Sequence, residues 1–167
     1  MISNLVETKM KGKLVIDREP ESEWGYLLVD EDVRNKCFAL LGLADIGYYS
    51  LPDYEAHISA FTNNEVVALP SRLLQERKWC EFEPMHLKVV NPDDWDEVNA
   101  CVILCVKCKA LEHLREQLGF EPLMYGDHEF HITIGISPNP ISNIILNVVD
   151  LFNKNLSNNL AVVLSKF

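Results

Sequence analysis

One unit of sequence occurs twice along the chain. No other feature of the sequence restricts the possible folds as much as this internal repeat. In the first copy, residues 24–30 (WGYLLVD) have the apolar character of a strand. Residues 31–41 then carry apolar side chains at helical spacing, and Gly42 is a typical helix stop. After a loop with Gly, Tyr and Pro, a second strand opens with His57-Ile58-Ser59.

The second copy repeats this order. Residues 98–106 are β-branched and apolar and predict a buried strand, and residues 109–118 predict a helix that ends in Leu-Gly at Gly119. A second loop with Pro, Tyr and Gly leads to a strand that opens with His131-Ile132-Thr133. The same residue pattern therefore follows the same elements in both halves.

The two pseudo-repeats cover approximately residues 24–69 and 98–137 of a chain of 167 residues, which is about the size of one domain. We therefore expect residues 1–167 to form a single domain. Strands and helices are mixed, without strict βαβ alternation or a Gly-rich phosphate loop, which favours the α+β class. A duplicated unit predicts a pseudo-two-fold axis, across which matching positions face each other.

Further elements are predicted outside the repeats. Residues 13–17 and 81–90 have the alternation of strands, and residues 70–77 and 141–152 predict helices. For the apolar residues 160–164 we expect a terminal strand.

Composition and charge exclude several classes of protein. Hydrophobic residues make up 48% and charged residues 24% of the chain, as in ordinary globular proteins. A net charge of −10 does not suit binding to duplex nucleic acid, which needs clustered Lys and Arg. The longest apolar run, residues 100–106, is too short for a membrane span, and residues 1–13 contain no apolar core of a secretory signal. We expect a cytoplasmic monomer that does not bind membranes.

Three of the five cysteines, Cys101, Cys105 and Cys108, are clustered and suggest a metal site at first sight. On a strand, however, Cys101 and Cys105 share one face, whereas Cys108 falls on the other face or past the end. Structural zinc sites use paired ligands at turns. We therefore expect no metal here, and an odd number of cysteines without a signal segment indicates reduced, buried thiols.

The two His-x-Ser/Thr motifs carry the chemistry. Side chains two apart on a strand point to the same face, so His57 projects with Ser59, and His131 projects with Thr133. If duplication brings these strands together, two imidazoles and two hydroxyls surround one space. Imidazole titrates near neutral pH, so one ring can be a general base and the other a general acid. The hydroxyls can donate to phosphate oxygens and stabilise developing charge.

A single His-x-Ser on a strand is more often a half-exposed sheet residue, but two copies in matching contexts are specific. The pair resembles the 2H phosphoesterase superfamily, and the stretches 110–120 and 128–135 are similar to its branch of viral and RNA-repair proteins. The resemblance implies two pseudo-symmetric lobes, each a small antiparallel sheet with helices outside, and a cleft between them. It also implies catalysis by His57 and His131 and phosphate binding by Ser59 and Thr133.

The function that we expect is cleavage of RNA-type phosphodiesters, either 2′,3′-cyclic phosphate ends or short linear or cyclic oligonucleotides, without a metal or an organic cofactor. The superfamily includes LigT-like cyclic phosphodiesterases, 2′-5′ oligonucleotide phosphodiesterases and RNA-end processing enzymes. A narrower alternative is a phage or viral antagonist that hydrolyses cyclic oligonucleotide or 2′-5′ oligoadenylate immune signals. An alternative of another class is a non-catalytic nucleotide-binding module or sponge.

Residues near the motifs are candidates for the rest of the site. Tyr54 and Tyr125 lie in the loops before the motifs and could stack a nucleobase, or else cap the core. His128 could line the mouth of the cleft. His86 and Lys88 share a strand face and could support a phosphate, or else lie on a solvated face.

For two other pairs of residues near the motifs, the sequence predicts no part in the chemical step. Trp24 and Tyr26 share a face of the first strand, for which core packing is the favoured interpretation. Glu55 and Glu129 each stand two residues before a motif histidine, where an orienting role is favoured over acid–base chemistry.

Overall fold

The computed structural model describes residues 10–20, 22–51, 54–75 and 78–164. Two predictions fall partly outside this part. Residues 1–9 belong to the segment predicted to lack a secretory signal, and residues 76–77 are the last two of the helix predicted over 70–77. None of the described helices is long and apolar enough to cross a membrane.

The described chain combines strands with helices, as the α+β prediction requires. The strands are β1 (Met10–Asp17), β2 (Trp24–Leu28), β3 (His57–Phe61), β4 (Trp79–Val90), β5 (Ala100–Lys107) and β6 (His131–Ser137). The helices are α1 (Glu31–Leu40), the 3₁₀ helix η1 (Leu43–Ile46), α2 (Asn63–Val66), α3 (Arg72–Gln75), α4 (Lys109–Gln117), α5 (Asn143–Lys154) and α6 (Leu156–Leu164).

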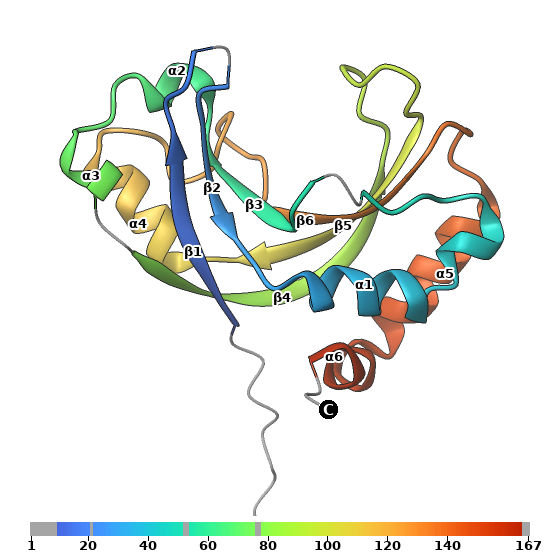
Figure 1. Cartoon of the computed structure of the whole chain (residues 1–167). Coiled ribbons are helices and arrows are strands. Elements are labelled where there is room, and N and C mark those ends of the chain that lie inside the picture. Colours follow the sequence, from blue (N-terminus) through green and yellow to red (C-terminus); the bar gives the residue numbers. More distant parts are fainter. Residues whose placement is uncertain (1–9, 21, 52–53, 76–77, 165–167) are drawn as a thin grey trace, which may run out of the picture.

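The six strands form one antiparallel sheet in the order β1-β2-β3-β6-β5-β4 (Figure 1). Strand β1 also pairs with β4, so the sheet closes on itself. Where the family resemblance implies two small sheets, hydrogen bonds therefore make one, because β3 meets β6 and β1 meets β4. The strand order is unchanged when β1 is exchanged with β4, β2 with β5, and β3 with β6.

Local signals in the sequence set the ends of the repeat helices. The Asp30 side chain accepts a hydrogen bond from the backbone N–H of Asp32 at 3.0 Å and caps the start of α1. Gly42 and Gly119 follow α1 and α4 with φ of 62° and 87°, in the left-handed region that glycine adopts without strain. The predicted helix stops are therefore confirmed.

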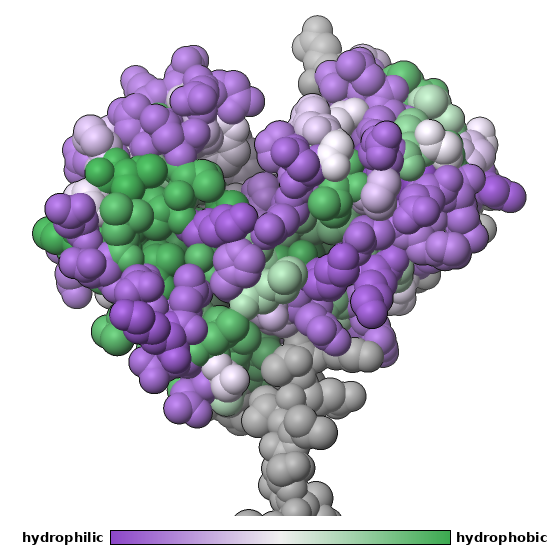
Figure 2. Space-filling view, turned by 180° about the vertical axis from the view of Figure 1, so that it is seen from behind, coloured by the Kyte–Doolittle hydropathy of each residue, from purple (hydrophilic) through white to green (hydrophobic). Residues whose placement is uncertain are grey.

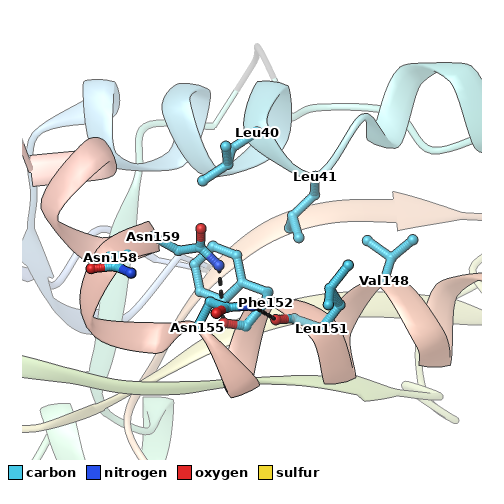
Figure 3. A pocket seen from close by; sticks show the side chains of 8 residues that line it. All are labelled: Leu40, Leu41, Val148, Leu151, Phe152, Asn155, Asn158 and Asn159. Atoms are coloured by element: carbon cyan, nitrogen blue, oxygen red, sulfur yellow. Dashed lines mark hydrogen bonds between the residues drawn. The ribbon is translucent and has the colours of Figure 1, made fainter.

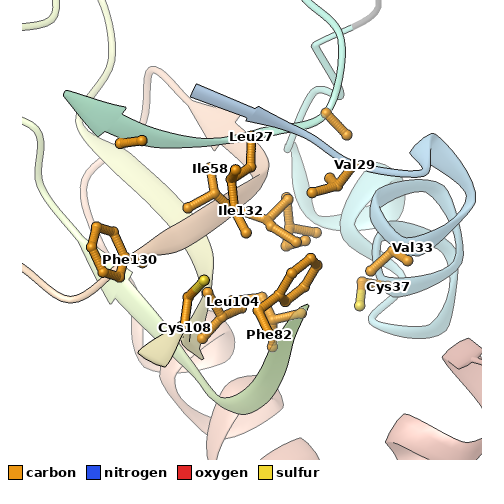
Figure 4. Packing of buried hydrophobic residues seen from close by; sticks show 14 of the residues in the cluster. Leu27, Val29, Val33, Cys37, Ile58, Phe82, Leu104, Cys108, Phe130 and Ile132 are labelled. Carbon is orange, nitrogen blue, oxygen red and sulfur yellow. The ribbon is translucent and has the colours of Figure 1, made fainter. Parts of the chain in front are cut away.

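The core lies against one face of the sheet. Ile58 and Ile132, the central residues of the two motifs, are fully buried and pack among Leu27, Phe82 and Leu104 (Figure 4). Because side chains alternate along a strand, the burial of the two isoleucines leaves the histidines and hydroxyls on the opposite face of β3 and β6.

Helices α1, α5 and α6 lie together on one side of the molecule, and α2, α3 and α4 lie on the other (Figure 1). Helix α1 packs against β6 and α6, and α5 packs against β4. The Asn153 side chain anchors α5, because it accepts from the Leu87 N–H at 2.9 Å and donates to the Leu87 carbonyl at 3.0 Å. In the view from behind, apolar side chains gather on the side where α5 lies (Figure 2). Helix α5 exposes Ile144, Leu146 and Leu151.

The terminal strand predicted over residues 160–164 is wrong, because these residues belong to helix α6. Leu160 and Val163 are the buried residues of this helix, and their spacing of three is helical. A short apolar run does not distinguish a strand from a buried helix by its pattern alone. The packing of α6 against α1 decides the outcome.

All five cysteines are free and buried. Cys101 and Cys105 share a small cluster with Ile103, whereas Cys108 lies in the main core, where its thiol and that of Cys80 interact. The three clustered cysteines therefore do not converge on one point, as the strand pattern predicts.

Candidate active site

The pairing of β3 with β6 brings the two histidine motifs together. Ile58 lies opposite Ile132 in an antiparallel register. The same register places His57 opposite Thr133 and Ser59 opposite His131 on the other face of the sheet. All four side chains are half-buried, so they are accessible from solvent and still held by their neighbours.

Both imidazoles are held by the same kind of backbone contact. Nδ1 of His57 lies 2.7 Å from the carbonyl oxygen of Glu55, and Nδ1 of His131 lies 3.2 Å from that of Glu129. A carbonyl oxygen only accepts hydrogen bonds, so each Nδ1 carries the proton. Each Nε2 is therefore unprotonated in the neutral ring. The orienting role expected for the two glutamates is played by their carbonyls.

Burial lowers the pKa of both histidines below the ordinary value of 6.5. For His57, the Glu55 carbonyl opposes this shift, and the charges of His131 and Arg34 add to it. For His131, the Glu129 carbonyl opposes the shift, and the charge of His128 adds to it. The charge of His131 therefore disfavours a second proton on His57, which suits a pair in which one ring acts as the base and the other as the acid.

The hydroxyls lie beside the histidines on neighbouring strands. Ser59 pairs with Tyr26 of β2, and Thr133 pairs with Ile103 of β5. The Thr133 hydroxyl also hydrogen-bonds with the thiol of Cys101. Both hydroxyls share the sheet face of the histidines, where they can donate to an anion between the two rings.

Trp24 and Tyr26 line the site, although the sequence favours core packing for them. Their rings are half-buried and lie 4.5 and 5.8 Å from the His57 ring, centroid to centroid, both in edge-to-face contact. The reason is the register of β2 with β3, which sets Tyr26 opposite Ser59 on the histidine face. Their spacing of two shows that they share a face, but a sequence does not tell which face.

The loop residues predicted near the site are exposed. Tyr54 and Tyr125 expose 61% and 72% of their surface, so neither caps the core. The His128 ring contacts the Tyr125 ring edge-on at 5.0 Å. Because the charge of His128 acts on His131, this loop stands beside the second motif.

His86 and Lys88 share the sheet face of His131, because β4 pairs with β5 so that His86 lies opposite Cys105, and Cys105 lies opposite His131. Both side chains lie against Glu129, with Lys88 Nζ 3.2 Å from Oε1 and His86 Nε2 3.7 Å from Oε2. Burial alone would raise the pKa of the Glu129 carboxyl, but Cys105 and Lys88 beside it hold that pKa below its usual value.

The same cluster could hold a metal ion. Among the described residues, the donor atoms of His86, Cys105 and Glu129 lie within 4.8 Å of one another. No sequence pattern groups these three residues, because they come from two strands and a loop that are brought together only by the β4–β5–β6 pairing.

Arg34 is a second residue that the sequence analysis missed. The residue is only 3% exposed, and Nη1 donates to the Tyr54 carbonyl at 2.6 Å, while Nη2 lies 3.7 Å from Glu31 Oε1. Arg34 thereby ties α1 to the loop that precedes His57. The available signal was its position beside Val33, on the buried side of the predicted helix.

An open pocket of about 530 Å³ lies elsewhere, between the end of α1 and helices α5 and α6 (Figure 3). Leu40, Leu41, Val148, Leu151 and Phe152 line its apolar part, together with Asn155, Asn158 and Asn159. None of these residues belongs to the histidine motifs, so shape alone does not single out the histidine face, whereas its paired chemistry does.

Comparison with known families agrees with this geometry. A family model described as "Swiss Army Knife, 2H phosphoesterase domain" matches residues 29–142, a range that includes both histidine motifs. No curated protein and no solved structure gives a significant match. Because the matched range covers more than half of the chain, the protein belongs to the 2H phosphoesterase superfamily.

Proposed function

We propose that the protein is a phosphodiesterase that cleaves RNA-type phosphodiesters, 2′,3′-cyclic phosphate ends or short linear or cyclic oligonucleotides, by acid–base catalysis between His57 and His131. The observation that carries this proposal is the matched pair of Nδ1 contacts to backbone carbonyls, at 2.7 and 3.2 Å. These contacts leave both Nε2 atoms available for proton transfer.

In the proposed reaction, the neutral ring accepts a proton at Nε2 from water, or from a ribose 2′-hydroxyl, as the oxygen attacks phosphorus. The protonated ring donates its Nε2 proton to the leaving oxygen, so the enzyme ends the step with the proton moved from one ring to the other. The two roles are exchangeable, because both rings are held in the same tautomer. The orientation of the bound substrate assigns them.

Ser59 and Thr133 donate hydrogen bonds to the non-bridging phosphate oxygens in this scheme and stabilise the charge that grows there. Their places opposite His131 and His57 in the register support this role. We further propose that the site lies at a pseudo-two-fold axis between two related halves. The strand order supports this, since it is symmetric under exchange of β1, β2 and β3 with β4, β5 and β6.

The proposal includes a nucleotide substrate in a monomeric, cytoplasmic enzyme whose reaction needs no metal. The half-buried Trp24 and Tyr26 rings beside His57 support a nucleotide, because they offer aromatic surface for a base next to the reacting phosphate. Tyr54 and Tyr125, which are exposed at the loops, are further candidates for base contacts.

The test incubates the purified protein in excess EDTA with 2′,3′-cyclic AMP, 2′-5′ triadenylate, a short RNA and a 3′,3′-cyclic dinucleotide, and separates the products by chromatography. The blank is the His57→Ala/His131→Ala double variant. The proposal is supported if the protein cleaves any of these substrates and the double variant does not. The preferred substrate then separates a general phosphodiesterase from an antagonist of oligonucleotide signals. Binding of these nucleotides without any product would instead indicate a sequestering module.

A further inference from the structure

We propose that His86, Cys105 and Glu129 form a binding site for one transition-metal ion of the Zn²⁺ class, beside the catalytic histidines and separate from them. The three side chains come from β4, from β5 and from the loop before β6. Their donor atoms, one imidazole nitrogen, one thiol sulfur and one carboxylate oxygen, lie within 4.8 Å of one another.

The donor set suits this class of ion. Zn²⁺ binds His nitrogen, Cys sulfur and Glu oxygen at about 2.0–2.3 Å in a tetrahedron, so its ligand atoms are about 3.5 Å apart. His86 Nε2 and Glu129 Oε2 already lie 3.7 Å apart, which is too long for a good hydrogen bond and close to the separation of two ligands of one ion. A shift of about 1 Å would bring the third donor into place.

One carboxylate oxygen of Glu129 lies among the other two donor groups. Glu129 Oε2 is shielded from solvent and forms no well-aligned hydrogen bond among the described residues, although the Cys105 thiol and His86 stand beside this carboxylate, whereas Oε1 is bound by Lys88 at 3.2 Å. A buried anionic oxygen without a well-aligned donor is costly. An ion between Oε2, His86 and Cys105 would satisfy it without displacing Lys88 from Oε1.

The proton balance of binding is simple. The Cys105 thiol loses its proton to solvent as the metal–sulfur bond forms, while His86 binds through an unprotonated ring nitrogen and Glu129 binds as the carboxylate. No oxidation or reduction is involved. Three protein ligands leave a fourth tetrahedral position, which water can take.

The expected metal ligands differ from the cysteine cluster that the sequence suggests at first sight. Only Cys105 takes part, because Cys101 lies four residues away beside Thr133 and Cys108 lies in the core. The site adjoins the catalytic pair through Glu129, whose carbonyl lies 3.2 Å from His131 Nδ1. Its existence does not depend on the proposed reaction, and its test does not use turnover.

The test titrates metal-free protein with Co²⁺ and follows the near-ultraviolet charge-transfer band of a cobalt–thiolate bond. We expect a band that saturates at one equivalent and is displaced by Zn²⁺, which binds such sites more tightly than Co²⁺. Cys105→Ser should abolish the band, and Cys101→Ala, which removes a buried thiol of the same strand and face, should retain it. A missing band, or one that persists in Cys105→Ser, would overturn the proposal.

Two substitutions at less buried positions keep the test decisive if Cys105→Ser does not fold. His86→Ala should weaken Zn²⁺ binding by at least about 100-fold, measured by competition with a chelating dye. Lys88→Gln should tighten Zn²⁺ binding, because it removes a positive charge that competes for Glu129. Unchanged Zn²⁺ affinity in His86→Ala would overturn the proposal, as would weaker binding in Lys88→Gln.

Discussion

Ile58 lies directly opposite Ile132 where β3 meets β6, and both side chains are fully buried. This pairing joins β3 to β6 at the centre of both histidine motifs. It therefore determines that His57, Ser59, His131 and Thr133 emerge side by side on the opposite face. A slip of one residue in either strand would turn one motif into the core.

Removal of either histidine should remove activity. We expect His57→Ala and His131→Ala each to lower kcat by about 10²–10⁴-fold, because each deletes one partner of the proton transfer. Steady-state rates on the preferred substrate measure this, with circular dichroism to show that both variants are folded. The matched control is His113→Ala, in an exposed residue of α4, which should keep full activity. Near-normal rates in either motif variant would refute the two-histidine mechanism.

Removal of either hydroxyl should lower the rate of the reaction without abolishing it. Ser59→Ala and Thr133→Ala should each lower kcat by about 10²-fold, the usual effect of one missing donor to developing charge. Ser59→Thr and Thr133→Ser retain the hydroxyl and should recover most of the rate. If the hydroxyl-bearing variants were as slow as the alanine variants, the groups would act through packing and not through hydrogen bonds.

The pH profile of kcat/KM follows from the direction of the two pKa shifts. The general base must be neutral, so activity falls as pH drops through its pKa. The general acid must be protonated, so activity falls as pH rises through its pKa. Both pKa values lie below 6.5 in the free enzyme. We therefore expect a bell-shaped profile with its maximum below pH 6.5, measured by initial rates at low substrate. A maximum above pH 7 would contradict these shifts.

A buried ion pair between the two halves should contribute to stability. The Arg115 side chain of α4 is 1% exposed and binds Glu65 of α2 through two hydrogen bonds of 2.8 Å, and Nη1 also donates to the Ala60 carbonyl. Glu65→Gln leaves the buried guanidinium without its counter-charge, and we expect the free energy of unfolding to fall by about 3 kcal/mol.

Urea denaturation measures this effect, with Asp150→Asn as the control. Asp150 and Lys154 form an exposed pair at 2.9 Å on α5, and its loss should change the free energy of unfolding by less than about 0.5 kcal/mol. Equal effects of the two substitutions would show that the burial of Arg115 does not set the strength of its pair.

The features that the sequence predicts correctly depend on backbone geometry within a few residues. The cap at Asp30 and the glycines after α1 and α4 depend on neighbours within a few residues, and the alternation of side chains along β3 and β6 depends only on the strand itself. The repeat, the mixed class and the shared face of each His-hydroxyl pair therefore followed from the sequence.

Where the sequence analysis failed, the deciding partner is distant along the chain. Residues 160–164 are helical because α6 packs against α1, and Trp24 faces the site because β2 pairs with β3. Arg34 is buried because its guanidinium reaches the Tyr54 carbonyl. The sequence near each of these residues does not identify the distant partner that it contacts.

The sequence by itself determined which side chains project together from each strand, since that requires only the two-residue period of an extended backbone. Only the tertiary structure decided that β3 and β6 are neighbours, that Ile58 meets Ile132 and that His86, Cys105 and Glu129 come together. Strand register depends on hydrogen bonds and packing between residues far apart in the chain, and these interactions are formed only in the folded state.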